Sequence, residues 1–143
     1  MIPNDWAGKR VLITGVCGTI GKQLLHLIDQ EGPSEIVGID NNETELFFLA
    51  QEYRDRADVN LYLCDVRDRE DLLARSQGVD IILHTAALKH VILCEKAPSQ
   101  AIQTNILGVE NIIRVAQAVN AKRAVFTSSD KAVNPTNVMG TSK

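Results

Sequence analysis

The chain has 143 residues, of which 45% are hydrophobic and 23% charged, and its formal net charge is −3. This is enough for one domain with a hydrophobic core, and the lack of a basic stripe argues against a nucleic-acid partner. The N-terminus shows no charged segment followed by an apolar one, and no apolar run reaches membrane-spanning length, so we expect a cytoplasmic protein. Its three cysteines and three histidines lack metal-ligand spacing, so no metal site is expected.

A short apolar strand, a glycine-rich turn and a helix follow one another near the N-terminus. Residues 11–13 are Val-Leu-Ile, the composition of a strand buried on both faces. Side chains at the first two glycines of the turn would block a phosphate from the backbone, and one at the third would push helix and strand apart. The helix start would offer N–H groups to a pyrophosphate, although a plain glycine turn is the alternative. The candidate cofactor-binding residues here are Gly15, Gly18, Thr19, Ile20 and Gly21.

An acidic residue lies where a dinucleotide-binding fold requires one, about twenty residues after the glycines. Residues 36–39 predict a second buried strand, and Asp40 and Asn41 follow it. The Asp40 carboxylate could accept hydrogen bonds from both hydroxyls of the adenosine ribose, and it would repel a 2′-phosphate. Asn41 is not the arginine that would favour that phosphate, so we expect NAD, with NADP disfavoured. The T-G-x-x-G-x-x-G spacing resembles the extended branch of the short-chain dehydrogenase/reductase superfamily.

The rest of the chain alternates apolar strands with helical patterns, which predicts βαβ units and a parallel sheet. The expected class is α/β, a Rossmann-like doubly wound parallel sheet of about five strands with flanking helices, in one domain over residues 1–143. Asp68 is a predicted helix N-cap. The expected elements after Asp40 are helices over 43–53, 68–77 and 99–119 and strands over 60–64, 80–84 and 123–127. The apolar stripe of the last helix consists of Ile102, Ile106, Val109, Ile113 and Ala116.

Ligand contacts in an open α/β sheet fall at the carboxyl ends of the strands. Asp65 and Val66 follow the third strand, and Asp65 could accept a hydrogen bond from the adenine amino group or else cap a helix. Ala86 and Ala87 follow the fourth strand and are small enough for a backbone that passes a dinucleotide, or for a plain tight turn. Asn105 in the long helix is a further candidate, with a role in helix packing as the alternative.

Two strings make a family resemblance specific, namely A-A-L-K-H-V at residues 86–91 and S-D-K-A-V-N-P-T-N at residues 129–137. The chain resembles the nucleotide-sugar 4,6-dehydratases that act on UDP-N-acetylglucosamine in polysaccharide biosynthesis. The resemblance covers nearly the whole chain, but only the first half of a full-length member. It implies an NAD-dependent enzyme with a UDP-sugar substrate, and it leaves a homo-oligomer open.

The resemblance implies roles by position. Lys131 resembles the base that removes the sugar C5 proton, and Asp130 resembles the acid that helps to expel the C6 hydroxyl as water. Ser129 lies where the family's Ser or Thr bonds the C4 oxygen. Lys143 matches the lysine that holds the nicotinamide ribose, and Lys89 and Thr127 complete the candidate cofactor contacts. A surface ion pair on a loop is the alternative for the neighbouring Asp130 and Lys131.

Two departures from the pattern matter. Met139 replaces the tyrosine that serves as proton acceptor in this superfamily, so the C4 base is unassigned, with Asp130 or Lys131 as the alternatives. The sequence stops at Lys143, so we expect a truncated chain that lacks the nucleotide-sugar-binding portion and is inactive alone. A nucleotide-sugar 4-epimerase and a non-catalytic dinucleotide-binding module are the competing interpretations.

Overall fold

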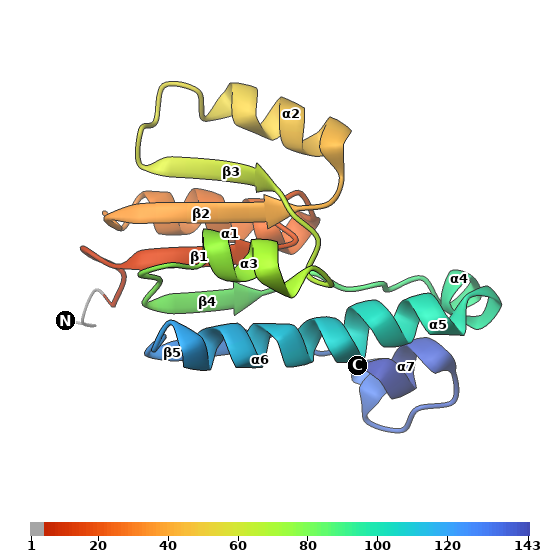
Figure 1. Ribbon diagram of the computed structural model, residues 1–143. Helices are drawn as coiled ribbons and strands as arrows, with labels where there is room; N and C mark the ends of the chain where they lie inside the picture. Colours follow the sequence, from red (N-terminus) through yellow and green to blue (C-terminus); the bar gives the residue numbers. More distant parts are fainter. Residues whose placement is uncertain (1–4) are drawn as a thin grey trace.

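The computed structural model describes residues 5–143 and contains a parallel five-stranded sheet in the order β3-β2-β1-β4-β5 (Figure 1). The chain starts in the middle of the sheet, builds outward to β3, and then returns to the other side of β1 to form β4 and β5. The reversal places the switch point of the sheet between β1 and β4. The Rossmann-like prediction is confirmed. The strands are β1 (Arg10–Thr14), β2 (Glu35–Asp40), β3 (Val59–Leu63), β4 (Ile81–His84) and β5 (Arg123–Phe126).

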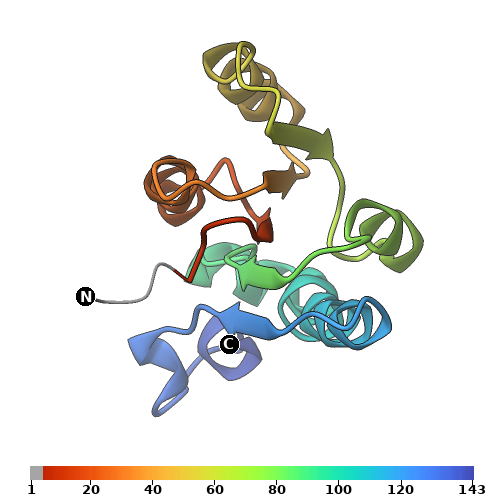
Figure 2. The ribbon, with the colours of Figure 1, turned by 90° about the vertical axis from the view of Figure 1, so that its left-hand side faces the viewer.

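Helices cover both faces of this sheet (Figure 2). One face packs against α1 (Thr19–Asp29) and α2 (Glu43–Glu52), and the other packs against α3 (Arg69–Arg75) and α6 (Gly108–Ala118). The predicted N-cap is confirmed, since Asp68 accepts hydrogen bonds from the backbone N–H groups of Glu70 and Asp71. Side chains of a strand alternate between the two faces, and apolar runs such as Val11-Leu12-Ile13 are therefore buried on both.

The long helix predicted over residues 99–119 is helical throughout but irregular. It consists of α5 (Pro98–Ala101), the π-helix η1 (Ile102–Leu107) and α6. The apolar stripe does not coincide with the buried face of this helix, because Ile102, Ile106 and Ile113 are 46%, 45% and 44% exposed. The face that packs inward is Ala101, Asn105, Gly108, Ile112 and Val115.

Close approach at Gly108 explains why the small residues face inward. A Cβ added to Gly108 would lie only 3.0 Å from Val66 Cγ2, so the helix rests almost directly on the segment that follows β3. The bulky isoleucines of the predicted stripe could not lie there without moving the helix away from the sheet.

Three short helical segments that the sequence did not predict gather beyond the carboxyl ends of β4 and β5. They are α4 (Val91–Lys96), the 3₁₀ turn η2 (Asp130–Ala132) and α7 (Val138–Ser142). Cys94, Ala101 and Met139 form a small buried cluster between α4, α5 and α7. None of the helices in residues 5–143 combines the length and apolarity that crossing a membrane would require.

A buried polar pair closes the core beneath the switch point. His84 is 3% exposed and its Nδ1 lies 2.7 Å from Thr14 Oγ1, while its ring meets Phe126 edge to face. Burial lowers the pKa of His84 to about 4, and the nearby positive charge of Lys143 acts in the same direction. The folded protein therefore holds His84 neutral at neutral pH.

This burial predicts a pH dependence of stability. The unfolded His84 titrates near 6.5, so between pH 6.5 and 4 the unfolded chain binds a proton that the folded chain excludes. The free energy of unfolding should fall by about 3 kcal/mol through this group as the pH drops from 7 to 4. Urea unfolding across this range should show a flatter pH profile for His84→Gln than for the wild type. His26→Gln, at an exposed position, is the matched control, and an unchanged profile in His84→Gln would contradict the assignment.

Candidate functional site

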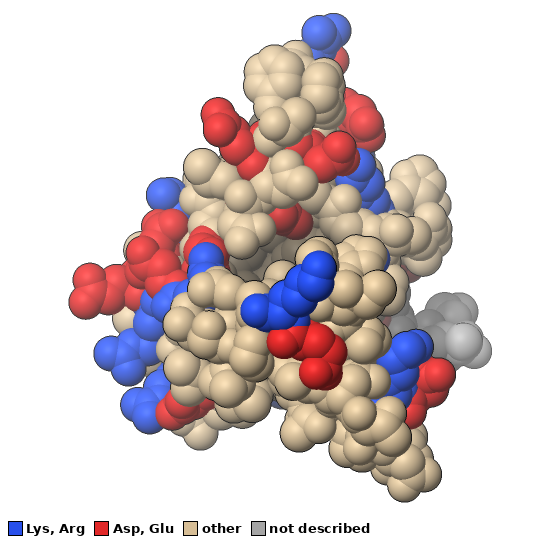
Figure 3. Space-filling model, turned by 90° about the vertical axis from the view of Figure 1, so that its right-hand side faces the viewer, with Lys and Arg blue, Asp and Glu red and all other residues tan. Residues whose placement is uncertain are grey.

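A cleft of about 530 Å³ opens at the carboxyl ends of the strands around the switch point. Figure 3 faces this side of the molecule, where the surface is hollowed and charges of both signs surround the hollow. Most of the predicted cofactor-binding residues line the cleft, namely Gly15, Gly18, Thr19, Ile20, Gly21, Asp40, Asn41, Asp65, Val66, Ala86, Ala87 and Lys89. Asn105, Thr127 and Lys143 do not.

Each of the three glycines in the loop lacks a side chain for a different physical reason. Gly15 has φ +67°, and a Cβ there would lie 2.7 Å from the backbone nitrogen of Ala86, so its missing side chain makes room for the loop after β4. A Cβ at Gly21 would overlap the carbonyl oxygen of Gly15 and lie 2.7 Å from Val16 Cα. Gly18 is different, because its Cβ would meet only the Gly15 oxygen, at 3.3 Å. Of the three, Gly18 is the one whose missing side chain leaves room in the cleft.

The N-terminus of α1 presents unpaired backbone donors to the cleft. Gly18 is the N-cap and no side chain caps the helix, which has no acidic residue in its first turn. Thr19 and Ile20, the first residues of the helix, line the cleft. Open N–H groups and the positive end of an eleven-residue helix favour an anion at this position.

Asp40 fixes the glycine loop to the end of β2. Its Oδ2 accepts a hydrogen bond from the Cys17 backbone nitrogen, and its Oδ1 accepts one from the Asn42 backbone nitrogen, both at 2.9 Å. Each oxygen retains acceptor capacity for a ribose hydroxyl. Burial, and then the charge of Asp40, raise the pKa of the Cys17 thiol to about 12, so this thiol stays protonated at neutral pH.

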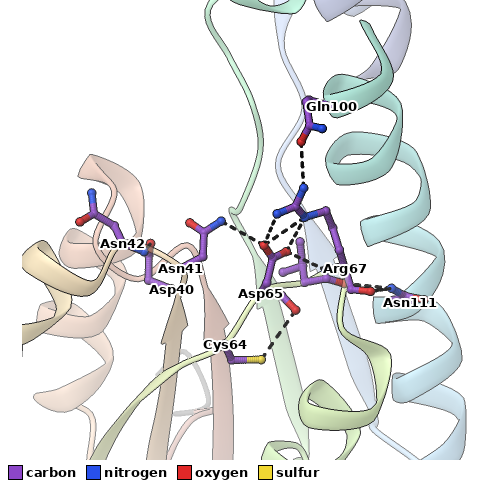
Figure 4. A network of polar contacts seen from close by, with 9 residues as sticks. Asp40, Asn41, Asn42, Cys64, Asp65, Arg67, Gln100 and Asn111 are labelled. Carbon is purple, nitrogen blue, oxygen red and sulfur yellow. Dashed lines mark hydrogen bonds and ion pairs between the residues drawn. The ribbon is translucent and has the colours of Figure 1, made fainter. Parts of the chain in front are cut away.

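A dense polar network forms the end of the cleft beside β3 (Figure 4). Arg67 Nη2 lies 2.6 Å from Asp65 Oδ2, and Arg67 Nη1 donates to Gln100 Oε1 at 2.9 Å. Asn41 donates to the same Asp65 oxygen at 3.3 Å. The Arg67 hydrogen bonds lower the pKa of Asp65, which is therefore a carboxylate at neutral pH. Sequence reasoning identified Asp65 but missed Arg67 and Gln100.

Asn105 lies behind the wall of the cleft. It is 5% exposed, and its side chain bonds the backbone nitrogen and oxygen of Leu88 at 2.8 and 2.9 Å and Ser142 Oγ at 2.9 Å. This side chain thereby joins the loop after β4 to the helix that precedes Lys143. The geometry gives Asn105 a positioning role, which differs from the direct cofactor contact expected from the sequence.

Ser129 caps the short turn η2 that follows β5, and Asp130 and Lys131 are its first two residues. Ser129 Oγ donates to Asp130 Oδ1 at 3.0 Å, and Lys131 Nζ lies 3.6 Å from the same oxygen. The Asp130 side chain is 88% exposed, and none of the three residues lines the cleft. The Ser129 hydrogen bond, followed by the charge of Lys131, lowers the pKa of Asp130. In this state Asp130 is a carboxylate, which is the opposite of what a proton donor requires.

Met139 lies in the first turn of the short helix α7, and Lys143 follows its last residue. Met139 is 3% exposed and packs against Cys94 and Ala101, so its side chain points into protein rather than into the cleft. Lys143 Nζ donates to the Thr127 carbonyl at 3.1 Å, and partial burial lowers the pKa of its ammonium group. No three His, Cys, Asp or Glu side chains in residues 5–143 come together in a way that could hold a metal ion.

The glycine geometry separates binding from folding in two variants. Gly18→Val should lower the melting temperature only slightly, because the Gly18 backbone is extended and its Cβ would have one tight contact, 3.3 Å from the Gly15 oxygen. It should nevertheless weaken dinucleotide binding about a hundredfold by filling the anion site. Gly21→Val should instead lower the melting temperature by roughly 5 °C or more, because its Cβ overlaps backbone. Calorimetric titration and thermal unfolding measure both; wild-type affinity in Gly18→Val would reduce the loop to a structural turn.

Several known proteins are similar to this chain in both sequence and fold. The family model described as polysaccharide biosynthesis protein matches residues 11–143. A protein of Methanocaldococcus jannaschii described as an uncharacterized membrane protein is 41% identical over 99% of this chain and 42% of its own length. An inverting UDP-N-acetylglucosamine 4,6-dehydratase of Campylobacter jejuni (strain 81-176) is 34% identical over 95% of this chain and 41% of its own length.

Two solved structures extend the likeness to three dimensions. Pen from Bacillus thuringiensis has a TM-score of 0.94 and 38% identity, covering 96% of this chain and 43% of that one. A UDP-glucose 4-epimerase from Stenotrophomonas maltophila, solved with NAD and formylated UDP-arabinopyranose, has a TM-score of 0.81 and 25% identity, covering 94% and 45%. The chain thus spans about two-fifths of the length of the two sequence relatives, 42% and 41%. Because the family model covers nearly all of it, the chain belongs to the polysaccharide biosynthesis protein family.

Proposed function

We propose that this chain is the cofactor-binding part of an NAD-dependent nucleotide-sugar 4,6-dehydratase of the UDP-N-acetylglucosamine type, active in polysaccharide or surface-glycan synthesis. The observation that carries the proposal is the arrangement of groups at one edge of the sheet, where the parallel strands end. A dinucleotide-sized cleft with an open helix N-terminus and Asp40 lies there, and the Ser129-Asp130-Lys131 turn follows β5 at the same edge. The identity to the Campylobacter dehydratase supports the choice of substrate.

The charges of the cleft favour NAD over NADP. Asp40 would repel a 2′-phosphate on the adenosine ribose. The arginine that lines the cleft, Arg67, is paired with Asp65 and offers little uncompensated positive charge. The Stenotrophomonas structure, with NAD bound in a related fold, supports a nicotinamide dinucleotide. When bound, this cofactor would accept a hydride from the sugar C4 position and return it at C6.

Side chains after β5 supply the proton transfers in this mechanism. Lys131 removes the C5 proton, which a C4 ketone makes acidic, and Asp130 protonates the departing C6 hydroxyl. Ser129 donates a hydrogen bond to the C4 oxygen, and Lys143, which donates to the Thr127 carbonyl, would hold the nicotinamide ribose. For Asp130 to act as an acid its pKa must rise, and a sugar that covers this exposed carboxyl would raise it by desolvation.

The proton acceptor for the C4 hydroxyl is not Met139, whose thioether cannot accept a proton and whose side chain is buried. Asp130 and Lys131 are the two alternatives, acting directly or through a water molecule. The Lys131 side chain is half-exposed and the Asp130 side chain is more exposed, so the protein does not cover either of them.

A nucleotide-sugar 4-epimerase is the second candidate, and the likeness to the Stenotrophomonas enzyme favours it. Epimerisation needs no acid to expel a hydroxyl, so the Asp130–Lys131 pair weighs toward dehydration. A non-catalytic dinucleotide-binding module is the third candidate function. The argument for it is Met139, which cannot serve as the proton acceptor.

Product mass distinguishes these functions. A longer protein, in which this chain is continued to the length of its relatives, should convert UDP-N-acetylglucosamine to a product lighter by one water, as seen by mass spectrometry with NAD present. The 143-residue chain alone should bind NAD without turnover, because binding energy from the remote nucleotide positions the reacting sugar.

Single substitutions in the longer protein locate the chemistry. Lys131→Ala should reduce dehydration by a factor of about a hundred or more, whereas Lys96→Ala, on the exposed end of α4, should not. A product of unchanged mass but altered configuration at C4 would identify an epimerase. Dehydration by the 143-residue chain alone would contradict the proposal that residues outside it are needed to bind the nucleotide-sugar.

A further inference from the structure

The helix α7 is too short to hold its own position. It has five residues, Val138–Ser142, and the N–H groups of its first three residues have no partner inside the helix. The Asn137 side chain accepts a hydrogen bond from the Gly140 backbone nitrogen at 2.8 Å, and the Asn137 carbonyl accepts one from the Thr141 nitrogen at 3.0 Å. Because a single helical turn is unstable alone, contacts with the rest of the protein must fix α7.

Glu95 on the helix α4 supplies a partner for the first residue of α7. Its Oε1 accepts a hydrogen bond from the Val138 backbone nitrogen at 2.6 Å, across 43 residues of sequence. A hydrogen bond to a carboxylate is stronger than one between neutral groups. Cys94 and Met139 also join the two helices by apolar packing, which is not directional. The hydrogen bond of Glu95, in contrast, fixes where α7 begins.

The helix α7 touches the backbone of Lys131 and leads directly to Lys143. A Cβ added to Gly140 would overlap the Lys131 carbonyl oxygen, so α7 and the turn η2 are in direct backbone contact. Lys143 follows the last residue of α7, and its Nζ donates to the Thr127 carbonyl at 3.1 Å. A displacement of α7 would therefore move Lys143 and disturb the backbone of Lys131.

The helix α4 connects Glu95 to the cofactor cleft. Residues 86–89 line the cleft, and α4 begins two residues later, at Val91. Glu95 itself is exposed and does not line the cleft. Its carboxylate thus joins the segment at the cleft to the helix that leads to Lys143, and it takes no part in the cleft wall.

We propose that Glu95 is a positioning residue, which holds α7 in place and thereby sets Lys131 and Lys143 relative to the cofactor cleft. The inference rests on the proposed function, in which these two lysines act at the sugar and at the nicotinamide ribose. Because misplacement of a reacting group by about 1 Å can cost roughly a hundredfold in rate, the hydrogen bond from Val138 to Glu95 should matter for turnover more than for binding.

Hydrogen exchange of the 143-residue chain tests the first step, because it needs no enzymatic activity. Glu95→Ala should speed the exchange of the Gly140 and Thr141 amides about tenfold, since α7 would open more often, although their own acceptors in Asn137 remain. Glu95→Gln keeps an acceptor oxygen and should stay within about threefold of the wild type. Glu52→Ala removes the same charge from an exposed position on α2, and this matched control should exchange as the wild type does.

Steady-state kinetics of the longer protein test the second step. Glu95→Ala should lower kcat for dehydration about tenfold at a temperature where the variant is folded, while KM for UDP-N-acetylglucosamine changes less than about threefold. Glu95→Gln should recover most of kcat, and Glu52→Ala should not differ from the wild type. A role in stability alone would instead lower the melting temperature and leave kcat of the folded enzyme unchanged.

Three results would overturn the inference. The first is wild-type exchange of the α7 amides in Glu95→Ala, and the second is wild-type kcat in that variant. The third is a loss in Glu95→Gln as large as in Glu95→Ala, which would mean that the hydrogen bond is not the cause. A longer protein that fails to dehydrate the sugar would remove the proposed function, whereas the exchange data would still decide whether Glu95 holds α7.

Discussion

The contact between the Asp40 carboxylate and two backbone N–H groups underlies the whole candidate site. One oxygen holds Cys17 in the glycine loop, and the other holds Asn42 at the start of α2. Asn42 in turn caps α2 by accepting from the Glu45 backbone nitrogen. A single side chain therefore sets where α1 and α2 begin relative to β2. The same carboxylate lines the cleft, so under the proposed function the group that fixes the loop would also select the cofactor.

Close contacts between backbone segments hold the other parts of the candidate site together. The β4 loop reaches the glycine loop because Gly15 has no side chain, and α6 reaches the loop after β3 because Gly108 has none. Asn105 then connects the β4 loop to α7, and Gly140 lets α7 lie against the Lys131 carbonyl. Through these contacts the cofactor cleft and the turn that carries Asp130 and Lys131 share one framework.

The strands and the glycine loop were predictable because their signals are local. Buried runs such as Val11-Leu12-Ile13 and the spacing from the glycines to Asp40 depend only on neighbours along the chain. The inward face of the long helix differs from its apolar stripe, because a π-helix interrupts the regular spacing and Gly108 approaches Val66, which is far away in sequence. The Arg67–Gln100 contact was not predictable for the same reason, since 33 residues separate the two side chains. The sequence shows that Met139 stands where the superfamily has a tyrosine, but only the tertiary structure shows that its side chain is buried.

The central role of Asp40 is tested most directly by the relative affinity of the chain for NAD and NADP, measured in the wild type and in a variant of Asp40. The wild type should bind NAD at least about tenfold more tightly, since a 2′-phosphate would lie against the Asp40 carboxylate. Asp40→Asn keeps an acceptor for one of the two N–H groups but removes the charge, and it should narrow that gap while the chain stays folded. Equal affinity for the two dinucleotides in the wild type, or an unchanged ratio in Asp40→Asn, would contradict the central role given to this carboxylate.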